Sequence, residues 1–291
     1  MTWSRNAPAT RPDPNPPPPH VDLHAHSVVS DGEDEPAALA LAARRCGLAA
    51  MALTDHDSLA GLDEFTAAAE GFEAVPGVEM STLTGHAEVH VLGYFVSPGD
   101  PALEKPLVEF RKVRDDRIHA MREKLAALGL HVPPDRLETP REGGSVGRPH
   151  LALAMVDLGF VSTVDEAFRK YLRRGKPAFV PRPAPDTLEV IRWIHQAGGK
   201  AVLAHPGILR RNGWIADFAK AGLDGLEVWH PRHSEPQRRN YLRLAGELDL
   251  VPTGGSDYHG PRVGDAVIGQ EPVPLESLER LRERSVRSPR D

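Results

Sequence analysis

Short apolar segments of strand length alternate with helical segments through most of this chain. Seven strands are predicted, at residues 21–24, 49–54, 74–78, 89–95, 201–204, 225–229 and 250–253. Helical periodicity or helix-end residues predict helices at 34–46, after Ser58, and at 186–197, 215–221, 236–248 and 275–283. Repeated strand–helix units with short links favour parallel strands in an α/β fold.

The alternation is interrupted between residues 98 and 185. A long helical pattern occupies residues 103–128, and two shorter ones follow at 149–158 and 164–173. These patterns predict a helical insertion in the α/β fold. The basic residues of the long pattern are Arg111, Lys112, Arg114, Arg117, Arg122 and Lys124. A charged helix face is usually solvated, and contact with RNA is the alternative.

Composition is that of an ordinary globular protein. The 291 residues are 40% hydrophobic and 26% charged, so the chain is long enough to bury a sizeable core. The net charge of −6 gives no overall basic field that would hold long duplex nucleic acid. Cys46 is the single cysteine, which rules out an internal disulfide and favours the cytoplasm. No apolar run has the length of a membrane span, and no secretory signal is expected.

Six of the seven predicted strands carry residue types that bind metals, either within the strand or just after its end. These residues are His24 and His26, His56, Glu79, His90, His205, and Asp257 with His259. In barrels of alternating strands and helices, the chemistry lies at the C-terminal ends of the strands. Scattered core histidines would not be expected to fall there six times. Mixed imidazole and carboxylate ligands suit Mn²⁺, Fe²⁺ or Zn²⁺ better than Mg²⁺ or Ca²⁺.

Four motifs resemble those of the PHP (polymerase and histidinol phosphatase) family of metal-dependent phosphoesterases. They are D-L-H-A-H-S at 22–27, T-D-H-D-S at 54–58, A-H-P at 204–206 and G-S-D-Y-H at 255–259. G-V-E-M-S at 77–81 and H-V-L-G-Y at 90–94 fill the positions between them. The chain is most similar to the small bacterial members that hydrolyse nucleoside 3′,5′-bisphosphates and short RNA from the 5′ end.

The resemblance implies a distorted seven-stranded (β/α) barrel with two to three divalent metal ions. By position, the ligands of the first metal would be His24, His26, Glu79 and Asp257. Those of the second would be Glu79, His90 and His205, and those of the third Asp31, His56 and His259. Glu79, Asp257 and His259 would act most directly in catalysis, with the metals in place of a separate side-chain base.

The segment boundaries follow from the pattern and the resemblance together. Residues 1–20 are rich in proline and predict a disordered tail. Residues 21–97 and 186–285 predict the two parts of the barrel, and residues 98–185 a helical insertion over the active site. Residues 286–291 form a charged tail.

Three residues are candidates for substrate binding. Arg148 precedes an insertion helix in G-R-P-H, and its guanidinium fork matches a phosphate; the alternative is a surface arginine. His150 follows it, and His230 comes after a strand, where packing at the barrel rim is the alternative. Next to His56, Asp55 is a candidate for orienting a ligand, and Asp57 for capping the helix that follows.

The predicted function is a metal-dependent phosphoesterase that acts on a small nucleotide or short oligonucleotide. No membrane association and no obligate protein partner are expected. One alternative is a histidinol-phosphate phosphatase, whose substrate has one phosphate and an amine. Another is a non-catalytic PHP module that binds metal or nucleic acid for a partner such as a polymerase. Missing ligands would be the mark of such a module, and no ligand position is missing here.

Overall fold

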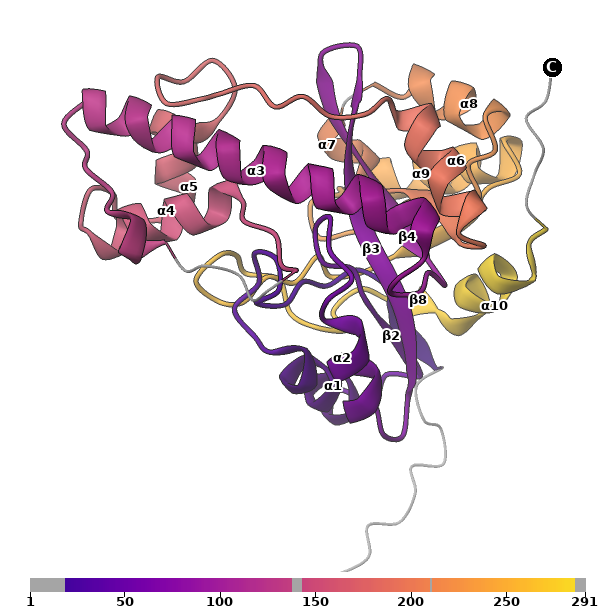
Figure 1. Cartoon of the computed structure of the whole chain (residues 1–291). Coiled ribbons are helices and arrows are strands. Elements are labelled where there is room, and N and C mark those ends of the chain that lie inside the picture. Colours follow the sequence, from indigo (N-terminus) through magenta and orange to yellow (C-terminus); the bar gives the residue numbers. More distant parts are fainter. Residues whose placement is uncertain (1–18, 138–142, 210, 286–291) are drawn as a thin grey trace, which may run out of the picture.

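The computed structural model describes residues 19–137, 143–209 and 211–285 (Figure 1). Most of the predicted proline-rich tail and the whole of the predicted tail at 286–291 lie outside the described residues. The strands are β1 (His20–Asp22), β2 (Ala50–Leu53), β3 (Glu73–Thr84), β4 (Ala87–Tyr94), β5 (Lys200–Leu203), β6 (Gly225–Trp229), β7 (Val251–Gly254) and β8 (Val273–Pro274). β1 thus begins at His20, which the sequence pattern assigned to the tail.

These eight strands form one sheet, in the order β7-β6-β5-β4-β3-β2-β1-β8, which curves into a nearly closed barrel. The closure joins the segments that follow β1 and β7. Leu23 N donates to Gly254 O at 3.1 Å, and Asp257 N donates to His24 O at 2.8 Å. The predicted α/β class is confirmed. The strand beyond the predicted seven is β8, whose two residues are too few to produce a periodic pattern.

The expectation of parallel strands throughout is wrong for β4. β3 and β4 form an antiparallel hairpin, because only Gly85 and His86 connect them and a parallel crossover needs about a dozen residues. β4 also pairs antiparallel with β5. The predicted strand at 74–78 continues to Thr84, so Glu79 lies within a strand and not after it. His90 lies within β4, inside the strand predicted at 89–95. Figure 1 shows the tip of this hairpin projecting beyond the rest of the sheet.

The helices lie where the sequence predicts them, with ends shifted by a few residues, and one short helix, α7, is unpredicted. They are α1 (Pro36–Arg45), α2 (Leu62–Ala68), α3 (Pro101–Ala127), α4 (Arg148–Asp157), α5 (Val164–Ala167), α6 (Thr187–Gln196), α7 (Pro206–Leu209), α8 (Gly213–Lys220), α9 (Glu235–Glu247) and α10 (Leu275–Glu283), with a 3₁₀ helix η1 (Pro134–Arg136) and a π-helix η2 (Phe168–Leu172). Among the described residues, no helix has both the length and the apolar character needed to cross a bilayer.

Alternation along the strands divides the core into two layers. In β2, Ala50 and Ala52 pack in a cluster made mainly of strand residues, whereas Met51 and Leu53 pack with the surrounding helices. The cluster of strand residues, which contains Ala50 and Ala52, fills the barrel interior. There the hydroxyl of Tyr94 donates to the carbonyl of Leu23 at 2.8 Å, close to the first predicted metal ligands.

Helix α3 connects the barrel to a second hydrophobic cluster. Its first half packs Leu103 and Leu107 into the layer that also holds residues of α6. Its second half packs Ile118, Met121 and Leu125 with residues of α4 and α5. Figure 1 shows α3 as a long rod that leaves the barrel and runs toward these two helices. From Ile118 onward, the residues of the predicted insertion therefore have a core of their own beside the barrel.

Closure of the barrel generates the first prediction. A Cβ at Gly255 would lie 2.4 Å from His24 N, so the backbone of one of the two segments would have to shift. We expect Gly255→Ala to destabilise the protein by about 1–3 kcal/mol, the usual cost of overpacking. Urea unfolding measures the change. Gly246→Ala, in helix α9 with no atom within 4 Å of its Cβ, is the control and should be neutral or stabilising. Equal stability of the two variants would contradict this account of closure.

Candidate metal centre

The nine predicted ligands come together at one mouth of the barrel. Three groups can be distinguished, in each of which the potential ligand atoms lie within 4.8 Å of one another. The groups are His24, His26, Glu79 and Asp257; His56, Glu79 and His90; and His26, Asp31, His56 and His259. The ninth residue, His205, joins through its Nε2, which lies 2.9 Å from Glu79 Oε1. Residues more than 230 positions apart in the chain therefore share one site.

Glu79 lies at the centre of this arrangement. Its two oxygens are approached by five imidazoles, with His90 and His205 at 2.8 and 2.9 Å from Oε1 and His56, His26 and His24 at 3.1, 3.2 and 3.3 Å from Oε2. Burial alone would raise the pKa of Glu79, but the nearby imidazoles hold it well below its ordinary value. Glu79 is therefore an ionised carboxylate with both oxygens facing ligand nitrogens, as a carboxylate that bridges two cations requires.

Several potential ligand atoms of the site are buried without a hydrogen-bond partner in the described part of the chain. His24 Nε2, His26 Nε2, Asp31 Oδ1 and His56 Nδ1 are buried and have no hydrogen-bond partner among the described residues. Buried polar atoms without partners are rare because each loses its hydration. Cations placed within the groups that contain these residues would give each of the four atoms a partner. Their mixture of imidazole nitrogens and carboxylate oxygens fits divalent ions such as Mn²⁺, Fe²⁺ or Zn²⁺.

Glu227 orients two of the ligands, a role that the sequence analysis missed. His24 Nδ1 donates to its Oε1 at 2.9 Å, and the backbone N of His205 donates to its Oε2 at 2.6 Å. The first bond fixes the tautomer of His24 and directs the lone pair of Nε2 into the site. The available signal was the single carboxylate in the otherwise apolar, fully buried start of strand β6, G-L-E-V-W.

Asp55 supports the loop that carries the first ligands. It accepts hydrogen bonds from Ser27 N, Ser27 Oγ and Ser30 Oγ, at 2.6 to 2.8 Å. Ser30 Oγ in turn lies 3.4 Å from His26 Nδ1. The structure therefore favours the interpretation of Asp55 as a residue that orients a ligand, through Ser30.

Asp57 does not cap a helix, because α2 begins only at Leu62. Its carboxylate instead accepts from Arg114 Nε at 2.6 Å and from Ser81 N at 2.9 Å. Burial would raise the pKa of Asp57, but Arg114 and Arg182 hold it below its usual value. Its backbone has a φ of 52°, a left-handed conformation that is costly outside glycine and is found at functional sites.

Two basic residues of helix α3 are buried against the site and not solvated. Arg114 also donates to Ser81 Oγ at 2.9 Å, so it ties the loop after His56 to the strand of Glu79. Arg117 donates to Glu88 Oε1 at 3.0 Å. Both side chains are about one-tenth exposed, at 10% and 8%. Helix α3, the first helix of the predicted insertion, therefore positions the elements that hold the candidate ligands.

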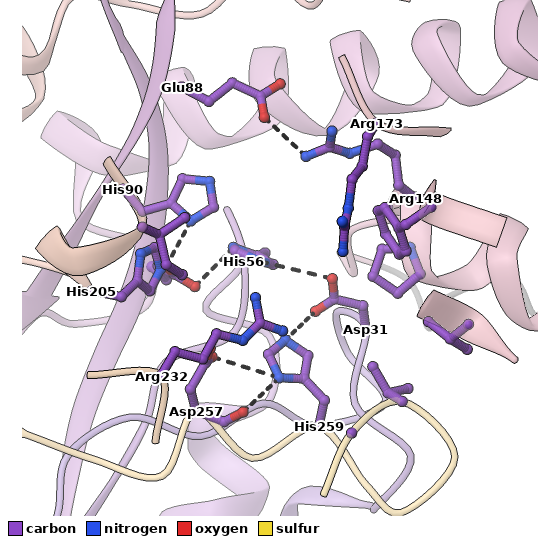
Figure 2. A pocket seen from close by; sticks show the side chains of 18 of the residues that line it. Asp31, His56, Glu88, His90, Arg148, Arg173, His205, Arg232, Asp257 and His259 are labelled. Atoms are coloured by element: carbon purple, nitrogen blue, oxygen red, sulfur yellow. Dashed lines mark hydrogen bonds and ion pairs between the residues drawn. The ribbon is translucent and has the colours of Figure 1, made fainter. Parts of the chain in front are cut away.

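A cavity of about 1000 Å³ opens above the ligands (Figure 2). Asp31, His56, Glu79 and Asp257 line its floor, and arginines line much of its wall. One of these is Arg148, whose Nη2 donates to Glu88 Oε2 at 2.9 Å. Burial would raise the pKa of Glu88, but Arg148 and Arg117 lower it to about 2.

The two candidate histidines have different surroundings. His230 lines the cavity, and its Nδ1 accepts from Arg232 N at 3.0 Å. The other nitrogen, Nε2, therefore carries the proton and donates to Asp257 Oδ2 at 3.2 Å. His150 is buried in α4, where its Nδ1 accepts from Gly147 N at 3.0 Å, and it is not among the described residues that line the cavity. Substrate contacts of Arg148, His150 and His230 stay predictions.

Comparison with known proteins identifies the family. A model of the PHP domain matches residues 22–128. The 5′-3′ exoribonuclease of Haemophilus influenzae is 36% identical over 247 residues, which cover 82% of this chain and 90% of that protein. This chain belongs to the PHP family.

Two other proteins are similar over nearly the same length as this PHP family member. The 3′,5′-nucleoside bisphosphate phosphatase of Chromobacterium violaceum is 35% identical over 260 residues, covering 86% of this chain and 90% of that protein. A solved structure from Bifidobacterium adolescentis, assigned to the metal-dependent phosphoesterases, has a TM-score of 0.86 and 32% identity. It covers 92% of this chain and 96% of that one.

Removal of metal should destabilise the folded protein. The site buries ionised carboxylates whose partners would then be imidazoles alone, and ligands that bind only the folded state stabilise it by mass action. At about 100 times the dissociation constant, one Mn²⁺ should raise the Tm by roughly 5–10 °C. Differential scanning calorimetry in Mn²⁺ and in excess chelator measures the shift. Equal melting temperatures in the two conditions would argue against a metal site.

Loss of the Glu227 carboxylate should weaken metal binding without unfolding the protein. Glu227→Gln keeps the size of the side chain but turns an amide NH₂ group toward one of its two hydrogen-bond donors, His24 Nδ1 or His205 N. We expect metal affinity to fall by roughly 10–100-fold, as for other residues that orient metal ligands. Calorimetric titration with Mn²⁺ measures it, with circular dichroism as the check on folding. Glu123→Gln, at an exposed position of α3, is the control and should bind metal like the wild type.

Proposed function

We propose that this PHP family member hydrolyses phosphate esters of nucleotides with the help of two to three divalent metal ions. Its substrates would be nucleoside 3′,5′-bisphosphates such as adenosine 3′,5′-bisphosphate (pAp), short 5′-phosphorylated RNA, or both. The observation that carries the proposal is the position of Glu79 and its five imidazoles at the floor of an arginine-lined cavity. The names of the relatives, an exoribonuclease and a bisphosphate phosphatase, point to the same chemistry.

The proposed ligand sets follow the grouping at the barrel mouth. The first metal would be held by His24, His26, Glu79 and Asp257, which form one of the three groups. The second would be held by His90, His205 and Glu79, and both imidazoles lie within 2.9 Å of Glu79 Oε1. The third would be held by Asp31, His56 and His259, with Asp31 3.8 and 3.4 Å from the two imidazoles.

Divalent ions bound here would polarise the phosphoryl group and make a nucleophile from water at neutral pH. The chain positions the reactants around that chemistry. Glu79, Asp257 and His259 would face the scissile phosphate, and His230 would hold Asp257 through its Nε2 proton. Arg148 would pair with a second phosphate of the substrate. The water would give up a proton as its oxygen bonds to phosphorus, and the 3′ oxygen would take up a proton as its bond to phosphorus breaks.

Product analysis tests this proposal most simply. The protein is incubated with Mn²⁺ and either pAp or a short 5′-phosphorylated RNA, and the products are separated by chromatography. We expect AMP and inorganic phosphate from pAp, and 5′-mononucleotides from the RNA. Faster turnover of histidinol phosphate than of pAp would support the alternative phosphatase. Tight RNA binding without hydrolysis in Mn²⁺ would support a non-catalytic module.

Substitution of a ligand should remove activity and leave the fold intact. Asp257→Ala or His24→Ala takes one donor from the first ligand set. We expect hydrolysis of pAp to fall by more than the roughly 10–100-fold typical of residues that only orient ligands. Initial rates in saturating Mn²⁺ measure it, with circular dichroism as the control for folding. Hydrolysis by metal-free protein at the wild-type, metal-loaded rate would show the mechanism to be wrong.

A further inference from the structure

Seven arginines line the cavity above the candidate metal centre, and six of them have a partner that fixes their side chain. Arg114 and Arg182 pair with Asp57, and Arg117 and Arg148 pair with Glu88. Arg173 pairs with Asp165, and Arg174 donates to the backbone carbonyl of His86. Most of the positive charge of the wall is therefore already engaged by protein groups.

Arg232 is the exception among these seven. Its side chain is exposed, and within the described ranges it forms no ion pair and no side-chain hydrogen bond. Its backbone N donates to His230 Nδ1 at 3.0 Å, which fixes the turn after β6 from which the side chain extends. In Figure 2 the side chain extends into the cavity, on the side of the site that holds Asp257 and His259.

The engaged arginines of the Glu88 group lie on the other side of the site. In Figure 2, Glu88 and Arg148 are separated from Arg232 by the ligands His56 and Asp31. A substrate whose scissile phosphate lies at the ligands would thus meet a guanidinium on each side. One side would take the 5′-phosphate in the function proposed above. The other side offers a free guanidinium to the part of the substrate that follows the scissile bond.

The size of the cavity agrees with a substrate longer than one nucleotide. Its volume of about 1000 Å³ is at the upper end of the range for small-molecule sites. In an oligonucleotide, the next group of high charge after the scissile phosphate is the following phosphate. An arginine without a carboxylate partner can pair with its oxygens without breaking an existing ion pair.

We propose that Arg232 is a specificity residue that binds the phosphate following the scissile one and so favours oligonucleotides over nucleoside bisphosphates. This rests on the proposed function for its choice of substrates. The contact does not exist for pAp, whose last phosphate is the scissile one. It exists for the 5′-phosphorylated trinucleotide pApApA, in which a second linkage follows the first.

The test compares the two substrates in Mn²⁺-loaded wild type, Arg232→Ala and Arg232→Lys. We expect Arg232→Ala to lower the ratio of kcat/KM for pApApA to that for pAp by about 10-fold, the effect of one hydrogen-bonded charge. The loss should lie in KM, and Arg232→Lys should recover part of it. In a plot of log KM for pApApA against log salt concentration, the slope should fall by about one in Arg232→Ala. Arg173→Ala removes a wall arginine that pairs with Asp165 and is the matched control; its ratio should stay that of wild type.

A binding measurement separates this inference from the proposed function. The ligand is a pApApA analogue in which a CH₂ group replaces the scissile 3′ oxygen, and wild type should bind it about 10-fold more tightly than Arg232→Ala. If wild type binds the analogue more tightly than Arg232→Ala but hydrolyses neither pAp nor pApApA, the proposed function is refuted and the role of Arg232 in binding stands. An equal loss for pAp and pApApA would place Arg232 at the scissile phosphate and overturn the inference. An unchanged ratio, or a wild type that does not bind the analogue, would also overturn it.

Discussion

The burial of ionised groups around Glu79 is the constraint on which the rest of this structure depends. One carboxylate lies within 3.3 Å of five imidazoles, and two further carboxylates, Asp31 and Asp257, complete the mouth of the barrel. Such groups are stable inside a protein only when every charge and polar atom has a partner. The surrounding elements meet part of this need, and bound cations would supply partners for the buried atoms that have none among the described residues. Glu227, Asp55 and Arg114 each hold a ligand or the loop that carries one.

The helices beside the barrel do not only cover the site; they also position residues that line it. Helix α3 packs one half into the barrel layer and the other half into a separate cluster with α4 and α5. Between these halves, Arg114 and Arg117 reach the site and bind Asp57 and Glu88. The barrel therefore supplies the candidate ligands, while these helices and the segment that follows them supply most of the arginines of the cavity wall.

The convergence of the candidate ligands could be predicted from the sequence because most of them are marked by local chemistry. His24 and His26 are two apart on an extended segment, and the other candidates follow or lie within apolar segments, except Asp31, which lies in the loop after His26. The antiparallel path of β4 was not predicted, because apolar alternation carries no information on strand direction. The roles of Glu227 and Arg114 were also not predictable, since they depend on pairing between segments far apart in the chain. A charge within an apolar strand shows that a partner exists but does not identify it.

Anomalous diffraction from crystals grown with Mn²⁺ tests the central claim most directly, because it locates the metals independently of activity. The account predicts at least two peaks at the barrel mouth, one of them bound by His24, His26 and Asp257. It also predicts a carboxylate oxygen of Glu79 within about 2.0–2.2 Å of a metal, the usual range for such bonds. The absence of any peak within bonding distance of Glu79 at saturating Mn²⁺, in crystals whose dissolved protein hydrolyses pAp, would contradict it.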